Sequence, residues 1–548
     1  MRRAIDGWTL SVCAVALLLA APVLTIFSFF FQPAGEVWRH LAATVLTEYV
    51  RNSFLLLLGV GFGTLLLGVS TAWLCTLCRF PGRRFFSWAL LLPMAIPAYI
   101  IAYTYTGLLD FAGPVQTILR NWFDWGFGDY WFPPVRSLGG AVVMLSLVLY
   151  PYVYLLARAA FLEQSMCVLE VSRTLGCGPW QAFFSVALPL ARPAIIAGLT
   201  LALMEALADF GTVQYFGVNT FTTGIFRTWF GLGDSAAAAQ LASLMMGFVL
   251  VLILLERWSR RRARYHHTSQ RHRSLPGYEL RGWRALGAFI VCLLPLFFGF
   301  LLPTGQLAAW ALRTWRFSLD TGFFLLLRNS LLLAIGTALL ALLLALLLGY
   351  GQRLRKGRMV GAAVRLAGMG YAVPGLVIAV GVIIPFAWLD NSLDAWMRSR
   401  FDYSTGLLLS GTLIAVVFAY LVRFLAISLQ TVEAALGKIR PSMDEAARSL
   451  GWRPAAVLRH IHLPMMRGSL LTALLLVFVD VLKELPATLI LRPFNFNTLA
   501  VRAFELASDE LLAESSVAAL AIVVVGLLPV FLLSRSMRRA RPGEDHAS

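Results

Sequence analysis

The sequence has little charge for its length. Only 14% of its 548 residues are Asp, Glu, Lys or Arg, whereas 59% are hydrophobic. A soluble globular protein of this length could not keep so much apolar surface out of water, so that class is excluded. A helix needs about 20 apolar residues to cross about 30 Å of hydrocarbon, and such runs recur from 8–31 to 513–533. The sequence therefore predicts an all-α polytopic membrane protein.

Lysine is nearly absent, which bears on whether the chain can use nucleotides. Lys356, Lys438 and Lys483 are the only lysines, and none belongs to a G-x-x-x-x-G-K-[ST] loop. That loop is the segment whose glycines and lysine cradle nucleotide phosphates. We therefore expect no ATPase site in this chain and no enzymatic activity.

Clustered metal ligands are also lacking. The only close cysteine pair is Cys75 and Cys78, with neither a second pair nor neighbouring histidines to complete a zinc site. His460 and His462 flank Ile461 without carboxylates or cysteines at ligand spacing, so we expect them to be solvated or to face lipid headgroups. The sequence predicts no cofactor and no stable metal site.

The basic residues explain the net charge of +18. They form short runs between apolar spans, of which 257–284 is the largest, and such runs mark cytoplasmic loops rather than a nucleic-acid surface. This places both termini and the 257–284 linker in the cytoplasm.

Twelve spans are predicted, centred near residues 20, 65, 97, 149, 202 and 247 and near 297, 340, 375, 418, 479 and 524. The connections near 36–50, 110–137, 213–236, 308–327, 389–405 and 491–512 then face outward, where Trp122, Trp125 and Trp131 are expected to anchor at the membrane interface or to meet another protein.

The chain contains an internal duplication. The motif Arg51-Asn52-Ser53 recurs as 328–330 and Ala95-Ile96-Pro97 recurs in similar form as 372–374, both displaced by 277 residues. A longer pattern around Glu170 and Pro189 recurs at Glu445 and Pro464, displaced by 275. Each copy holds six spans, and an even number makes the copies parallel, whereas many secondary transporters carry inverted repeats. We predict two tandem six-helix halves, 1–256 and 285–548, joined by the basic linker.

One repeated segment on the cytoplasmic side has a distinctive order of residues. In the second half, Glu445-Ala446-Ala447 is followed by Gly451 and, after nine residues, by 461–464, which reads Ile-His-Leu-Pro; the first half has the same spacing. Small residues let a helix lie close to a partner, and glycine ends a helix by taking a left-handed conformation. The prolines at 189 and 464 are expected to break the second helix before the next span.

This pattern resembles the EAA loop of ATP-binding-cassette (ABC) importer permeases. The resemblance implies a type I importer permease in the bacterial inner membrane, working by alternating access. It also implies a cytoplasmic ABC ATPase dimer that docks on segments 161–190 and 430–466, and a periplasmic substrate-binding protein. The docking residues would be Glu170, Gly176, Pro189, Glu445, Ala446, Ala447, Gly451 and Pro464. In the first copy, Val171 and Ser172 replace the two alanines, so that contact is expected to be looser.

Segments 208–225 and 483–498 resemble those of the fused permeases of ferric iron importers. The resemblance to these permeases extends over nearly the whole chain. Thiamine permeases share the fused plan, so thiamine, a polyamine or a phosphonate are alternative substrates. An ion-gradient secondary transporter is a more distant alternative.

Four acidic residues in the predicted fifth spans suggest a path for a cation. Glu205 and Asp209 are four residues apart, and Asp480 and Glu484 are their equivalents. Residues at i and i+4 share a helical face, acids inside a bilayer often mark a pathway, and oxygen donors suit a hard cation such as ferric ion. The competing interpretation is that Lys483 neutralises Asp480 or Glu484 and that the acids only stabilise helix packing.

Overall fold

A computed structural model describes residues 7–33, 35–126, 128–163, 178–261, 278–355 and 357–539. The chain forms two compact units, which are described separately. Unit 1 comprises 1–42, 224–246 and 319–502, and unit 2 comprises 43–223, 247–318 and 503–548. Within the described ranges, eleven helices are long and apolar enough to cross a membrane, or twelve if one bent pair counts as a span, which confirms the predicted polytopic helical class.

In chain order, the elements up to residue 261 are α1 (Gly7–Phe29), α2 (Glu36–Thr44), α3 (Leu46–Leu77), β1 (Cys78–Arg79), α4 (Arg83–Ala89), η1 (Leu92–Ala95), α5 (Ala98–Leu109), α6 (Pro114–Phe123), α7 (Leu138–Glu163), α9 (Pro179–Ala182), η2 (Phe183–Ala187), α10 (Leu188–Ala208), α11 (Gly211–Tyr215), α12 (Phe221–Phe230) and α13 (Ser235–Arg261). The remaining elements are β2 (Tyr278–Glu279), α14 (Trp283–Leu296), η3 (Phe297–Leu301), α15 (Leu302–Ser318), α16 (Thr321–Leu354), α17 (Arg358–Ala367), η4 (Gly370–Ala372), α18 (Gly375–Phe401), α19 (Leu413–Gly437), α20 (Pro441–Ser449), α21 (Pro454–Val457), η5 (Leu458–His462), α22 (Leu463–Leu482), α23 (Pro486–Leu491), α24 (Leu499–Ser508) and α25 (Leu512–Arg539). The two short strands pair in parallel.

The two units are built around equivalent helices from the duplicated sequence. In unit 2, α3, α7 and α10 pack together, and in unit 1 their equivalents α16, α19 and α22 do the same. The repeated Arg-Asn-Ser motif also makes the same bonds twice: Ser53 Oγ accepts from the Phe221 amide (3.3 Å), and Ser330 Oγ accepts from the Leu499 amide (2.8 Å). The duplication is therefore one of structure as well as of sequence.

Each unit contains helices from both sequence halves. In unit 1, α1 packs on α17 and α18, where the backbone of Gly381 approaches the Pro22 carbonyl so closely that a Cβ would lie 2.5 Å from its oxygen. In unit 2, α25 packs on α15 and η1, and Gly526 approaches the Ala95 carbonyl in the same manner. Glycine is required at such contacts because any side chain would enter the neighbouring backbone.

The third span of each half is broken near the residue predicted as its centre. A bend of 91° separates 83–95 from 98–123, and α18 begins at Gly375. Ile96 and Val373 are extended because each precedes a proline, which disfavours helical backbone. The predicted centres at 97 and 375 were therefore wrong. Most of the connection predicted at 389–405 is helical and belongs to α18.

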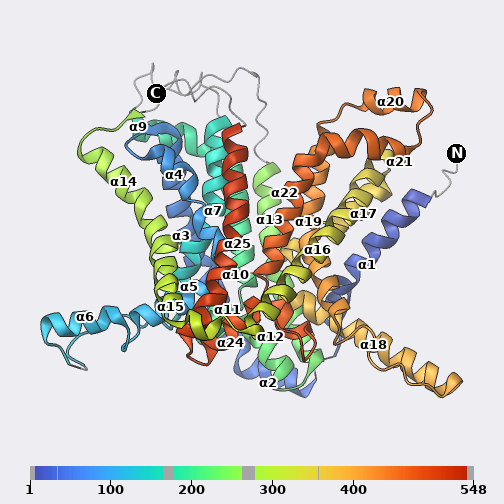
Figure 1. The fold of residues 1–548 in the computed structure, drawn as a ribbon, viewed down its shortest axis with the longest axis horizontal. Helices are drawn as coiled ribbons and strands as arrows, with labels where there is room; N and C mark the ends of the chain where they lie inside the picture. Colours follow the sequence, from blue (N-terminus) through green and yellow to red (C-terminus); the bar gives the residue numbers. More distant parts are fainter. Residues whose placement is uncertain are drawn as a thin grey trace. The chain divides into compact units, whose positions relative to one another are not determined.

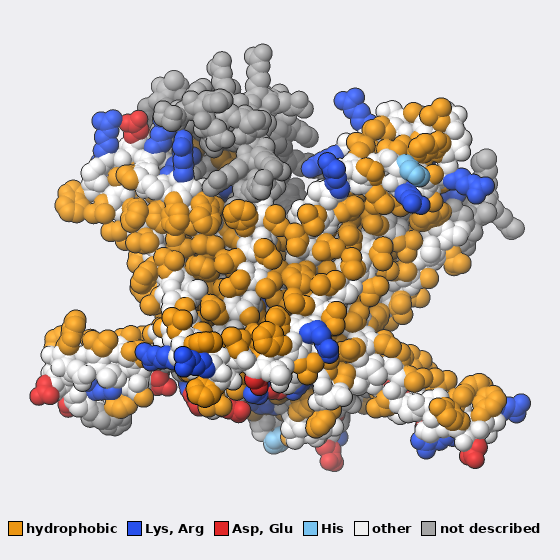
Figure 2. Space-filling model, in the orientation of Figure 1, with side chains coloured by type: hydrophobic (Ala, Val, Ile, Leu, Met, Phe, Trp, Pro, Cys, Tyr) orange, Lys and Arg blue, Asp and Glu red, His pale blue; other side chains and the backbone are white. Residues whose placement is uncertain are grey.

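The ends of the units differ in character from their middles. In unit 1, α20 and α21 lie at one end of α16, α19 and α22, and the C-terminal part of α18 projects at the opposite end (Figure 1). On the face shown in Figure 2, apolar side chains cover the middle of each unit's helices, and most charged side chains lie towards their ends. This distribution fits a bilayer around the middle of the helices.

Candidate functional site

The helix that carries the Glu-Ala-Ala sequence is short and sharply ended. Helix α20 begins with Pro441, whose fixed φ suits a first helical position. It ends at Ser449, and two residues later Gly451 has a φ of +80°. The amides of Gly451 and Trp452 donate to the carbonyls of Arg448 (2.9 Å) and Ala447 (3.1 Å). This pair of backbone hydrogen bonds is a Schellman motif. The predicted left-handed glycine at 451 is therefore confirmed.

The same helix presents a small exposed surface. Glu445 and Ala446 are exposed, whereas Ala447 is buried against the rest of unit 1. Beyond the helix end, Leu450 and Trp452 are 76% and 41% exposed, which is unusual for large apolar side chains outside a lipid-facing surface. The exposed surface of this helix thus carries the Glu445 carboxylate and the Arg448 guanidinium, with small and apolar groups beside them along the chain.

Three charged or polar side chains hold this helix to the membrane helices. Asp444, next to the exposed glutamate, is buried and accepts hydrogen bonds from Arg353 Nε (2.7 Å) at the end of α16. Its other oxygen lies 2.7 Å from His462 Nε2 in η5. Burial alone would raise the pKa of Asp444, but the bonds from Arg353 and His462 outweigh it and hold the pKa below its usual value.

The arginine of this group reaches a third helix. Its guanidinium also donates to the carbonyl of Leu436, in the last turn of α19, and to that of Ile439 (2.9 Å). The Tyr350 hydroxyl, one turn earlier on α16, donates to the Pro454 carbonyl (2.7 Å). The expectation that His462 is solvated was wrong, since its side chain is fully buried. The one signal in the sequence for this contact is Asp444, a charged residue at a position of α20 that is buried and therefore needs a partner.

The prolines at 189 and 464 do not break their helices, contrary to the sequence-based prediction. Each follows a turn of π-helix, Phe183–Ala187 and Leu458–His462, in which the next amide bonds five residues back rather than four. Widening the turn accommodates the proline ring and its missing N–H. The chain therefore continues as one long helix from 180 to 208 and from 454 to 482. The predicted docking residues Glu170 and Gly176 lie outside the described residues.

The fifth spans end at the second acid of each predicted pair. Asp209 follows the last residue of α10, and its carboxylate accepts from the amides of Thr212 (3.1 Å) and Val213 (3.2 Å). Glu484 does the equivalent beyond α22, accepting from the Ala487 amide (3.1 Å). The two acids thus cap the short helices α11 and α23, and they do not lie within the spans as predicted.

The second half adds ion pairs to this arrangement. Lys483 pairs with Asp480 (2.8 Å), as one interpretation of the sequence anticipated. Glu484 is 5% exposed and pairs instead with Arg423 of α19 (2.9 Å). Gly375 makes room for this pair, since a Cβ there would meet the guanidinium. Sequence reasoning missed Arg423 because it lies 61 residues away from Glu484.

Glu205 and Asp209 belong to unit 2, and Asp480 and Glu484 to unit 1. Glu205 is half-buried on α10, as is Asp209 just beyond it. Within the described ranges, no group of three or more His, Cys, Asp or Glu side chains is placed to hold a metal ion.

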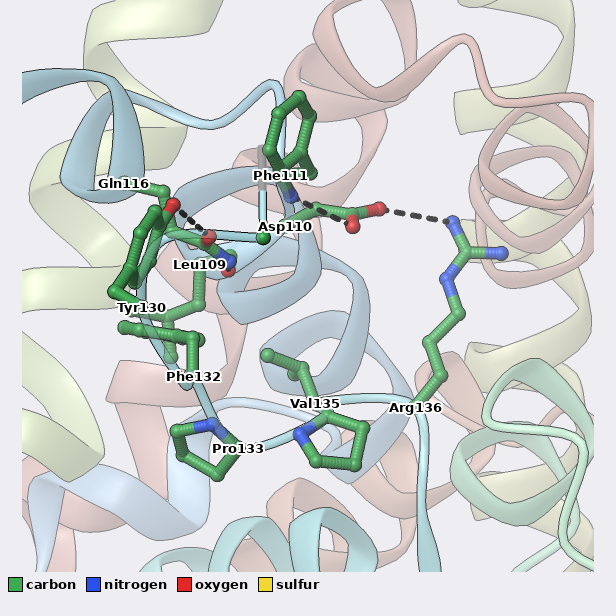
Figure 3. A pocket seen from close by; sticks show the side chains of 11 residues that line it. Leu109, Asp110, Phe111, Gln116, Tyr130, Phe132, Pro133, Val135 and Arg136 are labelled. Atoms are coloured by element: carbon green, nitrogen blue, oxygen red, sulfur yellow. Dashed lines mark hydrogen bonds and ion pairs between the residues drawn. The ribbon is translucent and has the colours of Figure 1, made fainter. Parts of the chain in front are cut away.

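Unit 2 also has an open pocket of about 370 Å³ beside α6, in the region predicted to face outward. Figure 3 shows Arg136 reaching Asp110 across it, and Tyr130 bonding Gln116 (2.6 Å). Arg136 also pairs with Glu510 (2.7 Å), so the pocket's charges are largely matched within the unit. The nearby side chain of Trp122 is 78% exposed.

Comparison with known proteins extends over both halves. The family model described as "Binding-protein-dependent transport system inner membrane component" matches residues 64–265 and again 339–542. The Fe(3+)-transport system permease protein FbpB 2 of Haemophilus influenzae is 26% identical over 535 residues, or 95% of this chain and 97% of that protein. The molybdenum transport system permease protein ModB of Escherichia coli is 28% identical over 203 residues, covering 36% of this chain and 86% of that protein. The sulfate transport system permease protein CysT of E. coli is 29% identical over 271 residues, covering 46% and 92%. These matches confirm the resemblance to ABC importer permeases, and the chain belongs to the family of binding-protein-dependent transport system inner membrane components.

Proposed function

We propose that this chain is the membrane-spanning permease of an ABC importer that moves ferric iron from a periplasmic binding protein to the cytoplasm. The relative named for Fe(3+) transport supports the substrate, because it aligns over nearly its whole length and over both halves. The relatives named for molybdenum and sulfate transport align over less than half of this chain. A fused, two-half permease for ferric iron is the function best supported.

The observation that carries the proposal is helix α20. Glu445 on this helix is exposed, Leu450 and Trp452 beyond its last residue are exposed as well, and Gly451 between them is in the left-handed conformation. A separate ATPase subunit would dock there, and a second copy would dock on 161–190 of the first half. That end of unit 1 then faces the cytoplasm, together with both termini and the basic linker, in agreement with the positive-inside rule.

Transport would follow by alternating access. Closure of an ATPase dimer on ATP binding would displace α20, and the contacts of Asp444 with α16 and η5 would pass this displacement to the membrane helices. The permease would then open outward to receive iron from the binding protein, and hydrolysis would reset it. The chain itself supplies no phosphate-binding loop.

Glu205 and Asp480 are the better candidates for a transient ferric site. Asp209 and Glu484 already accept backbone hydrogen bonds that cap α11 and α23, so their carboxylates are partly occupied by structural bonds. A site of few, weak oxygen ligands suits transport, since a carrier that binds tightly cannot release its substrate.

Uptake by a deletion strain tests the proposal. Loss of radiolabelled ferric iron accumulation, restored by the chain and its ATPase but not by the chain alone, is expected. If the strain instead failed to take up thiamine, a polyamine, a phosphonate or molybdate, the ferric assignment would be wrong. Uptake that needed no ATPase and was abolished by an uncoupler would identify a secondary transporter.

The acids are tested separately with Glu205→Gln and Asp480→Asn, singly and together. Slower iron uptake by a fully assembled complex is expected, with the amount of complex measured in the same membranes. Normal uptake by the assembled double variant would remove these two acids from the path. Asp209→Asn is the matched control, because Asn retains the capping oxygen while losing the charge.

A further inference from the structure

The ionic group beneath α20 is built from three residues of the second half whose repeat equivalents in the first half are uncharged. Arg353, Asp444 and His462 form it in the second half. The repeat displacements place Thr76, Leu169 and Ala187 at the equivalent positions of the first half. Thr76 and Ala187 are buried, at 2% and 0% exposed, and Leu169 lies outside the described residues. Three positions that meet in space thus differ together, and all three are uncharged in the first half.

Such a coordinated difference has a physical reason. A buried ion pair that loses one partner leaves an uncompensated charge in a poorly solvated site, which is strongly destabilising. Replacing all its members together leaves no such charge and can be nearly neutral for stability. Either set of three residues therefore avoids a buried charge without a partner.

We propose that Arg353, Asp444 and His462 are positioning residues that couple the second docking loop rigidly to the membrane helices, so that the two ATPase contacts transmit motion unequally. This rests on the proposed docking of an ATPase at α20. Arg353 joins the ends of α16 and α19 to α20, and His462 joins α20 to η5, which continues into α22. Directional, charge-assisted bonds resist sliding, whereas uncharged side chains, such as those at the equivalent positions of the first half, cannot form them.

The geometry also explains why these residues are distinct from the docking surface. Asp444 points into the unit and is 6% exposed, while its neighbour Glu445 is exposed. Substitution of the buried group therefore changes how the loop is held without changing what the ATPase would touch. Association and coupling can consequently be measured apart.

The test is the triple variant Arg353→Thr, Asp444→Leu, His462→Ala, which gives the second half the residues of the first. Hydrogen exchange of the α20 amides in the purified permease is expected to quicken at least tenfold. The ATPase should still co-purify, but its stimulation by the iron-loaded binding protein should fall at least fivefold. The single variant Asp444→Leu is expected to lower the yield of folded protein, and Asp444→Asn, which keeps a hydrogen-bonding side chain, should lie between it and the wild type.

Removal of the exposed pair Glu279–Arg281 by Glu279→Leu and Arg281→Thr is the matched control and should alter neither measurement. Unchanged exchange in the triple variant would overturn the rigid coupling, and faster exchange with normal stimulation would overturn the transmission of motion. A wild-type chain that bound no ATPase would instead refute the proposed function, while the exchange result would still decide the rigidity of the loop.

Discussion

The end of α20 allows a quantitative test of backbone conformation alone. Gly451 has a φ of +80°, and a Cβ built there would have nothing within 4 Å, so the substitution Gly451→Ala introduces no steric clash with a neighbour. Its whole effect should come from the left-handed conformation, which costs a residue with a Cβ roughly 1–2 kcal/mol. The reduced freedom of the unfolded loop recovers part of this, about 0.4–1 kcal/mol. The net expectation is a loss of about 1 kcal/mol in the stability of the helix end.

A loss of that size should raise the population of the frayed helix end about fivefold. Hydrogen exchange of the amides at 447–452 measures it directly in the purified permease, because the Schellman bonds of Gly451 and Trp452 must open first. The dissociation constant for the ATPase should change much less, because the folded, docking-competent loop still predominates while the frayed fraction is small. Gly451→Asn should show a smaller effect, because asparagine tolerates the left-handed region better than alanine does.

Gly437 supplies the matched control within the same docking segment. It is the last residue of α19, is not among the glycines with positive φ, and also has nothing within 4 Å of a Cβ. Gly437→Ala should leave exchange in α20 unchanged or slow it slightly, because alanine favours helix more than glycine does. Equal effects of the two alanine substitutions would show that the left-handed conformation of Gly451 is irrelevant to the loop.

Three further predictions concern the buried charges. Glu484→Gln should destabilise the permease by about 3 kcal/mol, because it breaks a buried ion pair with Arg423. Asp480→Asn should cost under about 1 kcal/mol, because the pair of Asp480 with Lys483 is partly exposed. Thermal unfolding in detergent compares the two variants, and equal losses of stability would contradict the argument. Gly375→Ala should disrupt the same pair, since a Cβ would meet the guanidinium and lie 2.6 Å from Glu484 Oε1, so its effect should not add to that of Glu484→Gln in the double variant. The pKa of Asp444 is lowered in the folded loop, so the stability that Asp444 contributes should be complete above the usual carboxylate pKa of about 3.9 and be lost only as the pH falls below it. Protease resistance of the loop across pH 3 to 7 tests this. Asp444→Asn should lack the acid-induced loss of resistance.

Local signals in the sequence predicted the features that depend on local chemistry. Apolar runs predicted helices of spanning length, the repeat predicted two equivalent helical cores, and Gly451 predicted a helix end. The break at Ile96 and Val373 was also written in the sequence, because a residue before proline avoids helical backbone. It was overlooked because hydropathy is continuous across the break, and hydropathy alone placed the span centres.

The features that were missed depend on partners far apart in the chain. Arg353 is 91 residues from Asp444, and the buried position of His462 follows only once η5 packs beside α20. The two π-helical turns are a subtler case. Proline within a helical segment usually signals a break, because it lacks an N–H and its ring clashes with the preceding turn. A single π-helical turn accommodates the proline while the helix continues, and the sequence pattern does not distinguish the two outcomes.

The division of the chain into halves has a different meaning in sequence and in structure. The repeat identifies segments that share an ancestor, whereas contacts identify segments that bury each other's apolar surface. Helix α1 has two thirds of its most apolar stretch unburied even though it packs on α17 and α18 of the other half, as expected for a helix that borders lipid. Because Gly381 and Gly526 bring these exchanged helices into backbone contact, each compact unit needs residues from both halves. The exchange therefore gives a mechanical reason for the two halves to work together, because a displacement of α16 to α19 carries a helix of the other half with it.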